Sequence, residues 1–377
     1  MGAAEQFIGL MSGTSLDGVD GVLARFDAQG RPRVLAHAHR PFPAALHDEL
    51  LALNSPGSDE LHRAALAANQ LAEVQANVVA DLLQQAQATP AQVLAIGSHG
   101  QTVRHRPGEF DGRGYTLQLN QGALLAERCG IDVVCDFRSR DVAAGGQGAP
   151  LVPAFHAIVF GGQTTDGAAL NLGGIANLTL LPPAGDARPV RGFDCGPGNA
   201  LLDFWIQRER GLPYDASGQW AASGQVLPVL LARLLDEPFL RLPPPKSTGR
   251  DLFNPVWLAG RLEGLPPATA PQDVQATLAE FTARCAAEAL QAEAPRTRTL
   301  LCCGGGAFND DLMARLQRLL PATTVASTAT AGLPPLQVEA AAFAWLAWAF
   351  CHRQPGNRPE VTGAAGLRVL GALYPAR

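Results

Sequence analysis

The sequence is poor in charged residues, and its charges nearly balance. Asp, Glu, Lys and Arg together make up 17% of the 377 residues, and the formal net charge is −5. This balance argues against a general nucleic-acid or membrane surface, because both require clustered positive charge. An anionic ligand would therefore need a local group of basic residues.

Targeting and cross-linking signals are also lacking. The N-terminus has no basic region followed by an apolar stretch, and Gln6 stands where a myristoylation signal has Ser or Thr. No uninterrupted apolar run approaches the roughly 18 residues of a membrane span. The seven cysteines form no Cys-x-x-Cys pair, and an odd number fits a reducing compartment. We therefore expect a cytoplasmic protein without a disulfide framework.

The composition does provide a large core and many turns. Apolar residues make up 47% of the chain, which is ample for a sizeable core, and its 40 Gly and 29 Pro favour tight turns. A chain of this length forms two domains or one large one. The pattern Gly-x4-Gly-Lys-Ser/Thr is absent, which excludes a Walker-type phosphate loop.

The most informative segment is a glycine turn between two apolar stretches, which predicts a β-hairpin over residues 5–26. The turn and the start of its second strand supply the candidate nucleotide-binding residues Gly13, Thr14, Ser15, Leu16, Asp17, Gly18, Val19 and Asp20. Glycines let backbone amides approach a phosphate, while hydroxyls and carboxylates add donors and a place for a metal or a proton. Because Asp-Gly is a common turn dipeptide, an ordinary hairpin is the alternative.

Two further glycine turns follow strands later in the chain. Residues 168–172 and 177–181 predict a second hairpin around Gly173 and Gly174, a weak repeat of the first at a spacing of about 160 residues. Residues 300–303 predict a buried strand before a helix over 310–320. Between these two elements lies a triple-glycine turn, Gly304, Gly305 and Gly306, which suits a phosphate or a flat ring against backbone.

Polar candidates for chemistry lie at the ends of other predicted strands and at a helix start. Those that could contact a substrate are His99, Gln101, Thr102, Arg138, Arg140 and Glu339. Asp194, in Phe-Asp-Cys-Gly-Pro-Gly-Asn, is a candidate base because a carboxylate can accept a proton from water. Asp194 as a helix cap is the plainer interpretation, although Asn199 also suits that position. The substrate candidates have plainer interpretations too: a buried strand-end histidine, a solvated basic face, and an acidic helix start.

Taken in order, these segments resemble the family of 1,6-anhydro-N-acetylmuramic acid kinases, within the superfamily of sugar kinases, heat-shock ATPases and actin. The matching segments span nearly the whole chain: 9–20, 98–102, 137–150, 171–177, 193–199, 246–251, 303–309 and 338–344. The resemblance implies an α/β protein with a two-domain, actin-like ATPase (ribonuclease H-like) fold. Mixed central sheets flanked by helices would enclose a nucleotide cleft between the domains. We expect domain I to comprise 1–133 plus about 353–377, and domain II 134–352.

The resemblance also implies an activity. An ATP-dependent kinase of this family hydrolytically opens 1,6-anhydro-N-acetylmuramic acid and phosphorylates its 6-oxygen, giving N-acetylmuramic acid 6-phosphate and ADP in peptidoglycan recycling. Asp194 would be the base, the three glycine turns would hold ATP, and the six substrate candidates would hold the sugar. Mg²⁺ would be bound mainly through ATP phosphates and water. The resemblance further implies a homodimer.

Other functions remain open at this point. A kinase for another sugar hydroxyl, a nucleotide-gated sugar-binding protein without turnover, and an autonomous glycosidase would each use part of the same residues. The sequence also departs from the family pattern, because Cys195 stands where Thr is common and Phe308 where His is common. These departures concern the surroundings of the base and the adenosine contact, so they bear on rate and nucleotide preference.

Overall fold

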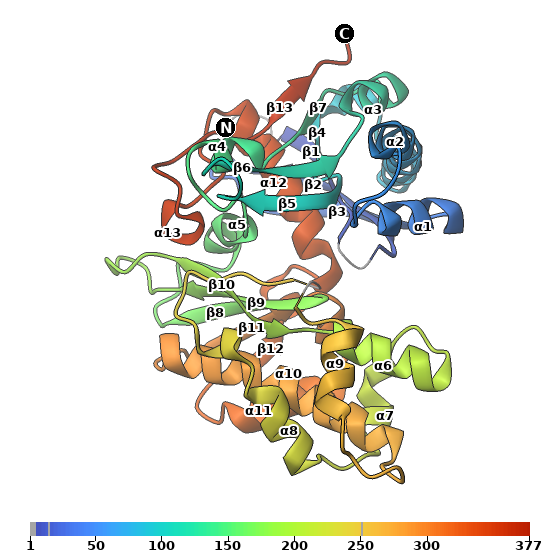
Figure 1. The fold of residues 1–377 in the computed structure, drawn as a ribbon. Coiled ribbons are helices and arrows are strands. Elements are labelled where there is room, and N and C mark those ends of the chain that lie inside the picture. The colour runs from blue at the N-terminus through green and yellow to red at the C-terminus, as the bar shows by residue number, and fades with distance from the viewer. Residues whose placement is uncertain (1–4, 14–15, 250–251) are drawn as a thin grey trace. The chain divides into compact units, whose positions relative to one another are not determined.

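The computed structural model describes residues 5–13, 16–249 and 252–377 and divides the chain into two compact units (Figure 1). Unit 1 combines Met1–Val159 with Leu336–Arg377, and unit 2 is the intervening Phe160–Pro335. The second unit is therefore inserted between two segments of the first.

Unit 1 is built on a six-stranded mixed sheet in the order β13-β7-β4-β1-β2-β3. Its strands are β1 (Glu5–Met11), β2 (Gly18–Phe26), β3 (Pro32–Pro41), β4 (Val93–Ser98), β7 (Val133–Cys135) and β13 (Ala372–Tyr374). The first two form the predicted antiparallel hairpin, in which Met11 pairs with Asp20. β4 runs parallel to β1, so its carboxyl end lies beside the hairpin turn.

The other elements of unit 1 surround this sheet or extend from it. They are α1 (Ala44–Ala52), α2 (Glu60–Gln85), the hairpin β5 (Gln101–Pro107) and β6 (Gly114–Leu119), α3 (Gly122–Cys129), α4 (Ser139–Ala143), α5 (Val152–Val159), α12 (Val338–Cys351) and α13 (Pro359–Thr362). Gly130 closes α3 in the left-handed conformation, as glycine commonly does at the end of a helix. The β5–β6 hairpin was not predicted.

Two helices cover opposite faces of this sheet. Glycines let α12 approach closely, because a Cβ at Gly9 would lie 1.9 Å from the carbonyl oxygen of Ala340. Gly21 faces the other way, toward Val78 on α2. Successive strand residues alternate between faces, so the pairing of Gly9 with Val22 sets Gly21 on the face opposite Gly9. Unit 1 is thus a helix–sheet–helix sandwich.

The boundaries of the units differ from the expected domains. Residues 134–159 and 336–352, which we expected in domain II, lie in unit 1. The physical reason is clearest for α12, which is buried around most of its circumference and packs on β1, β2 and β4. Figure 1 shows this helix, from near the chain's end, against strands from its beginning.

Unit 2 repeats the same strand arrangement. Its sheet has the order β10-β9-β8-β11-β12, formed by β8 (Gly167–Leu172), β9 (Ile175–Leu181), β10 (Arg191–Pro197), β11 (Thr299–Cys303) and β12 (Thr324–Ser327). β8 pairs antiparallel with β9 and parallel with β11, as β1 does with β2 and β4. The predicted hairpin repeat is confirmed, and the structure extends it to five strands in each unit.

The helices of unit 2 are α6 (Ala200–Arg210), α7 (Gln219–Ala222), α8 (Pro228–Leu235), α9 (Pro255–Leu262), α10 (Pro271–Glu293) and α11 (Asp310–Leu319). α10 and α11 cover one face of the sheet with aliphatic side chains. A second apolar cluster joins α6–α9 to α10 through aromatic side chains that include Phe253 and Phe281. None of the described helices combines the length and apolar character needed to cross a bilayer.

A buried ion network holds α11 against α10, and its loss should be costly. Glu280 is 4% exposed and accepts from Arg315 at 3.0 Å and Arg318 at 2.6 Å. The Glu280→Ala variant would leave Arg315, only 12% exposed, without this partner. We expect a loss of about 3 kcal/mol, measured as a lower Tm. Glu288→Ala, at a 58% exposed site, is the control and should change stability by less than about 0.5 kcal/mol. Equal effects of the two variants would contradict this assignment.

Candidate active-site residues

The first glycine turn connects β1 to β2 in unit 1. Of its candidates, Thr14 and Ser15 lie outside the described residues. Leu16 is buried with φ of 60°, an uncommon conformation for leucine, and its amide donates to the Gly13 carbonyl at 3.3 Å. The carbonyl of Asp17 accepts from Phe42 at the end of β3. The turn is therefore held by its own backbone and by the neighbouring edge strand.

Gly18, Val19 and Asp20 begin β2, and their side chains have different surroundings. Val19 is fully buried in the core of unit 1. Asp20 Oδ1 lies 3.4 Å from His37 Nε2 and 3.2 Å from His39 Nδ1 on β3. Burial opposes ionisation of Asp20, but the hydrogen bonds from both histidines outweigh it and lower the pKa of the carboxyl. The same hydrogen bond raises the pKa of His39. Asp20 is therefore an ionised partner of cross-strand histidines.

Residues 99–101, which follow β4, are hydrogen-bonded to Ser12 and Gly13 at the start of the glycine turn. Ser12 Oγ donates to Gln101 Oε1, and Gln101 Nε2 donates to the Gly13 carbonyl at 3.1 Å. His99 Nδ1 lies 3.1 Å from the carbonyl oxygen of Ser12, and the His99 amide donates to Leu10. The oxygen and the nitrogen of the Gln101 side-chain amide are therefore both hydrogen-bonded within the protein. We predicted His99 and Gln101 as sugar contacts; in this structure their side chains face the glycine turn.

Arg138 lies beside His99, whereas Arg140 does not join it. The Arg138 guanidinium donates to His99 Nε2 from Nη2 at 2.9 Å and to the Gly148 carbonyl from Nη1 at 2.8 Å. Burial lowers the pKa of Arg138 to about 10, and the charge of Glu339 opposes that shift. Arg140 is exposed on α4. The structure thus brings together His99, Arg138 and Glu339 of the predicted sugar group.

The loop that orients Arg138 is itself fixed by a buried carboxylate. Asp141 has no exposed surface and accepts hydrogen bonds from the Gly148 amide, Asn357 Nδ2 and Thr362 Oγ1. Thr102 lies on β5, where its hydroxyl accepts from Gln118 at 3.2 Å. Sequence reasoning assigned no role to Ser12, because its partner Gln101 is 89 residues away in the sequence.

Asp194 lies on β10, an edge strand of unit 2. Its amide donates to the Lys246 carbonyl at 3.1 Å, and its Oδ2 accepts from the Thr248 amide at 2.9 Å. The pairing of β10 with β9 shifts between Asp194 and Gly196, a bulge of the kind that re-aims side chains near sites. Asp194 is not a helix cap, because α6 begins later, at Ala200. Asn199 occupies that cap position, but its side chain donates to Leu172 instead of capping.

The surroundings of Asp194 favour its protonated form. Burial raises the pKa of this carboxyl to about 6, while the Thr248 amide and the charge of Lys246 act in the opposite direction. Among the described residues, Oδ1 of Asp194 accepts no hydrogen bond. A carboxyl that is half ionised near pH 6 and retains one oxygen for a ligand can remove a proton from water.

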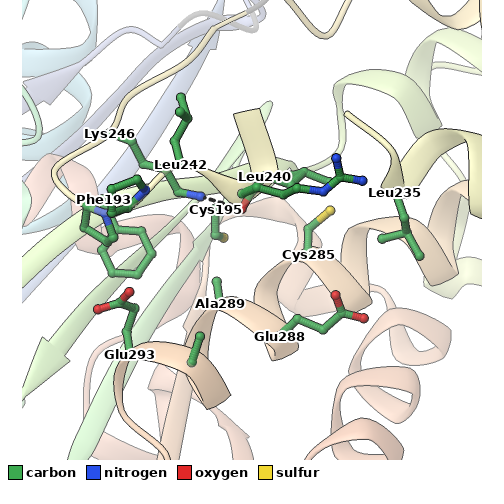
Figure 2. Close-up of a pocket in the computed structure, with 14 residues that line it drawn as sticks. Phe193, Cys195, Leu235, Leu240, Leu242, Lys246, Cys285, Glu288, Ala289 and Glu293 are labelled. Carbon is green, nitrogen blue, oxygen red and sulfur yellow. Dashed lines mark hydrogen bonds between the residues drawn. The ribbon is translucent and has the colours of Figure 1, made fainter. Parts of the chain in front are cut away.

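A pocket of about 450 Å³ lies next to this strand, and Figure 2 shows the residues that line it. Phe193 and Cys195, the neighbours of Asp194, line it together with Cys285 on α10, and Asp194 does not. Lys246 also lines it and donates from Nζ to the Leu240 carbonyl at 3.0 Å. Cys195 Sγ donates to the Ala176 carbonyl at 3.3 Å, so the side chain that departs from the family pattern is hydrogen-bonded to β9.

The two glycine turns of unit 2 meet around Asn199. The carbonyl of Gly173 accepts from the Asn199 amide at 2.7 Å, and that of Gly174 accepts from the Gly198 amide at 3.0 Å. Gly304 follows β11 with φ of 77°, and a Cβ there would lie 2.6 Å from Asn171 Oδ1.

The third glycine of the later turn is equally close-packed. A Cβ on Gly306 would lie 2.6 Å from the Leu172 Cβ and 2.9 Å from Asn199 Oδ1. Gly305 is the middle residue of this turn, and Phe308, which follows it, is 53% exposed. Glycine is therefore required at 304 and 306 because the neighbouring chain leaves no room for a Cβ, and this turn packs directly against the end of β8.

A resident metal has no preformed ligand set in the part of the chain that the structure describes. There, no group of three or more His, Cys, Asp or Glu side chains is arranged to hold an ion. The cross-strand cluster of Asp20, His37 and His39 does not meet that requirement. A divalent ion at these turns would take its ligands from phosphate oxygens and water.

Comparisons with known proteins agree over the whole chain. The family model described as anhydro-N-acetylmuramic acid kinase matches residues 5–376. The anhydro-N-acetylmuramic acid kinase of Variovorax paradoxus is 62% identical over 99% of this chain and 100% of its own. That of Bordetella petrii is 63% identical over 98% of this chain and 96% of its own.

A solved structure with little sequence likeness shares the fold. Component A of (R)-2-hydroxyglutaryl-CoA dehydratase from Acidaminococcus fermentans is 10% identical, covers 92% of this chain and 100% of its own, and has a TM-score of 0.50. At 10% sequence identity, this similarity is evidence for the fold only. It agrees with the repeated five-stranded sheets described above.

Proposed function

We propose, because the chain belongs to the anhydro-N-acetylmuramic acid kinase family, that it opens 1,6-anhydro-N-acetylmuramic acid with water and ATP, and that Asp194 is the base. The chain is a phosphotransferase of the sugar-kinase fold, with an alcohol oxygen as acceptor. Its products are N-acetylmuramic acid 6-phosphate and ADP, which belong to the recycling of cell-wall sugars.

The glycine turns are proposed to bind the nucleotide. In this proposal the phosphates lie against the backbone of Gly173, Gly174 and Gly304–Gly306 in unit 2 and against the glycine turn that follows β1 in unit 1. When bound, Mg²⁺ would neutralise charge on the transferred phosphoryl group.

The chemistry couples two displacements. In the anhydrosugar the 6-oxygen is bonded to the anomeric carbon, so the acceptor hydroxyl must first be released. Asp194 takes a proton from water as the water oxygen bonds to that carbon. The bond from this carbon to the 6-oxygen breaks, and its electron pair forms the new bond to the γ-phosphorus. ADP leaves with the electron pair of the broken phosphoanhydride bond. Attack opposite the departing oxygen predicts inversion at the anomeric carbon.

One observation carries the proposal: a carboxyl with a raised pKa is fixed by the Lys246–Thr248 segment at its backbone and at one oxygen. The test is turnover with ATP in ¹⁸O-labelled water, followed by mass spectrometry of the sugar phosphate. We expect one labelled oxygen at the anomeric carbon for each ADP released. A phosphorylated sugar without label would favour a kinase for a free hydroxyl. Ring opening without ATP would favour a glycosidase, and binding without ADP release a nucleotide-gated sugar-binding protein.

The pKa of Asp194 predicts an acidic limb in the rate profile. Because this pKa is raised to about 6, the base loses its charge as pH falls through that value, and kcat/KM should drop about tenfold per pH unit below it. The measurement is kcat/KM between about pH 4.5 and pH 8.5, with thermal unfolding at each pH to separate loss of fold. A flat profile down to about pH 4.5 would contradict Asp194 as the base.

We also propose a cytoplasmic location and a homodimer. ATP supply and seven cysteines, all unpaired in this structure, support a reducing compartment. Fractionation of cells and the mass of the purified protein in solution test these two points separately.

A further inference from the structure

The hydrogen bonds of His99 fix which of its nitrogens carries the proton. Arg138 only donates, so Nε2, which lies 2.9 Å from Arg138 Nη2, must be the acceptor. The carbonyl of Ser12 only accepts, so Nδ1, at 3.1 Å, must carry the hydrogen. A neutral ring with the proton on Nδ1 satisfies both partners, and burial, which lowers the pKa of His99 to about 3, keeps it neutral.

This ring connects two parts of the chain that face different ligands. Ser12 immediately precedes Gly13 in the turn proposed to hold phosphate. Arg138 is one of the residues expected to hold the sugar, and a guanidinium is well shaped to bind the lactyl carboxylate of the muramic acid. The ring of His99 is 6% exposed and packs on Phe343 with centroids 4.7 Å apart, so it cannot shift without disturbing the core.

Arg138 retains donors for a ligand while bound to His99. A guanidinium has five N–H groups; among the described residues, three of them find acceptors, from Nε and Nη2 to His99 and from Nη1 to Gly148. Two N–H groups therefore remain, enough for the two oxygens of a carboxylate. Binding of that carboxylate offsets the field of the Arg138 charge and orients its guanidinium, and both effects act on the acceptor nitrogen of His99.

We propose that His99 is a positioning residue that couples the sugar carboxylate at Arg138 to the phosphate turn at Ser12 and Gly13. It contacts neither ligand, and its role is to make binding of each ligand favour binding of the other. The inference rests on the proposed function, because that function supplies the carboxylate and the phosphate. It replaces the direct sugar contact that we expected of His99.

Coupling of this kind is reciprocal and can be measured without turnover. The dissociation constant of a non-hydrolysable ATP analogue is measured with and without saturating anhydrosugar, and the ratio is the coupling factor. We expect a factor of about 10 in the unmodified protein. His99→Phe keeps the packing on Phe343 but removes both hydrogen bonds, and its factor should fall below about 2.

Two further substitutions each remove one of the two hydrogen bonds that His99 makes, to Arg138 or to Ser12. His99→Asn places an amide where Nδ1 was, so it keeps the bond to Ser12 but removes the acceptor for Arg138. It should bind the analogue alone normally and lose the coupling. His99→Gln places its amide where Nε2 was and should bind the sugar alone normally and lose the coupling. If His99→Phe does not fold, these two variants decide the question.

His105→Phe is the matched control. His105 also feels the charge of Arg138, but its Nδ1 lies 2.9 Å from Thr116 Oγ1 on β6, away from the turn. Its coupling factor should stay within about twofold of the unmodified value. An unchanged factor in His99→Phe, an equal loss in His105→Phe, or a factor of 1 in an unmodified protein with normal turnover would each overturn this inference alone. Absence of sugar binding and turnover in the unmodified protein would instead overturn the proposed function, and this inference with it.

Discussion

Asp194→Asn is expected to lower kcat about 10³- to 10⁴-fold with ATP and the anhydrosugar, and to leave the protein at least as stable as before. The catalytic loss follows because an amide cannot accept the proton of the attacking water, and general base catalysis contributes up to about that much. Asparagine keeps an oxygen for the Thr248 amide, which now donates to Asp194 Oδ2 at 2.9 Å. The local backbone should therefore keep its form.

The stability change follows from the pKa of the carboxyl. In the folded protein the pKa of Asp194 is raised to about 6, so between about pH 4 and pH 6 the folded state holds a proton that the unfolded state has released. Stability therefore falls as pH rises through this range, and above it the folded state carries a disfavoured charge. Removing that charge should stabilise the protein by roughly 1 to 3 kcal/mol at pH 8 and by little near pH 4.

The measurement pairs initial rates of ADP release with thermal unfolding at both pH values. Asp236→Asn is the control, because Asp236 is an exposed carboxylate of the same unit, paired with Arg241. It should change the rate less than twofold and the Tm little. Full activity of Asp194→Asn would remove Asp194 as the base, whereas inactivity with a lower Tm at pH 8 would assign it a structural role.

Arg138→Met is expected to lower kcat/KM for the anhydrosugar about 100-fold. A guanidinium–carboxylate pair in a half-buried setting contributes about 3 kcal/mol, and methionine fills a similar length without charge. The effect should depend on the substrate. The unmodified protein should prefer the muramic acid over 1,6-anhydro-N-acetylglucosamine, which lacks the lactyl carboxylate, and the variant should largely lose this preference.

The substrate comparison separates recognition from folding. A variant that merely loosened the loop at Gly148, to which Arg138 donates, would lose rate equally with both sugars. Arg140→Met is the control, because Arg140 is exposed on α4 and lies outside the His99 group. Both arginines were among the six residues expected to hold the sugar. A loss of preference in Arg140→Met with none in Arg138→Met would reverse their assignment.

Much of the fold could be predicted from local patterns. The hairpin around Gly13, the repeat around Gly173, and the strand before Gly304 were each visible as apolar stretches separated by glycines. Tight turns and close approaches between two backbone segments require glycine, so these positions can be recognised from the sequence alone. The same holds for the helix expected over 310–320, which is observed as α11 (Asp310–Leu319). The family resemblance then supplied the activity and the candidate base.

The unit boundaries required tertiary information. α12 is apolar nearly all round, and nothing in its sequence states which sheet buries it. Gly9 and Gly97 explain why α12 packs on this sheet. A Cβ at either position would lie about 2 Å from a backbone oxygen of the helix, so only glycine allows this close approach. These two glycines lie in the strands of unit 1. The helix that we expected in domain II therefore packs there.

The sequence by itself determined the glycine turns, the carboxylate at Asp194 and the family to which the chain belongs, because these depend on residue types and their order. Only the tertiary structure decided what each polar side chain binds. His99 and Gln101 were expected to face the sugar, and they are hydrogen-bonded to Ser12 and Gly13. The partners of a buried polar group are set by which distant backbone atoms lie within hydrogen-bond reach, and the sequence does not contain that distance.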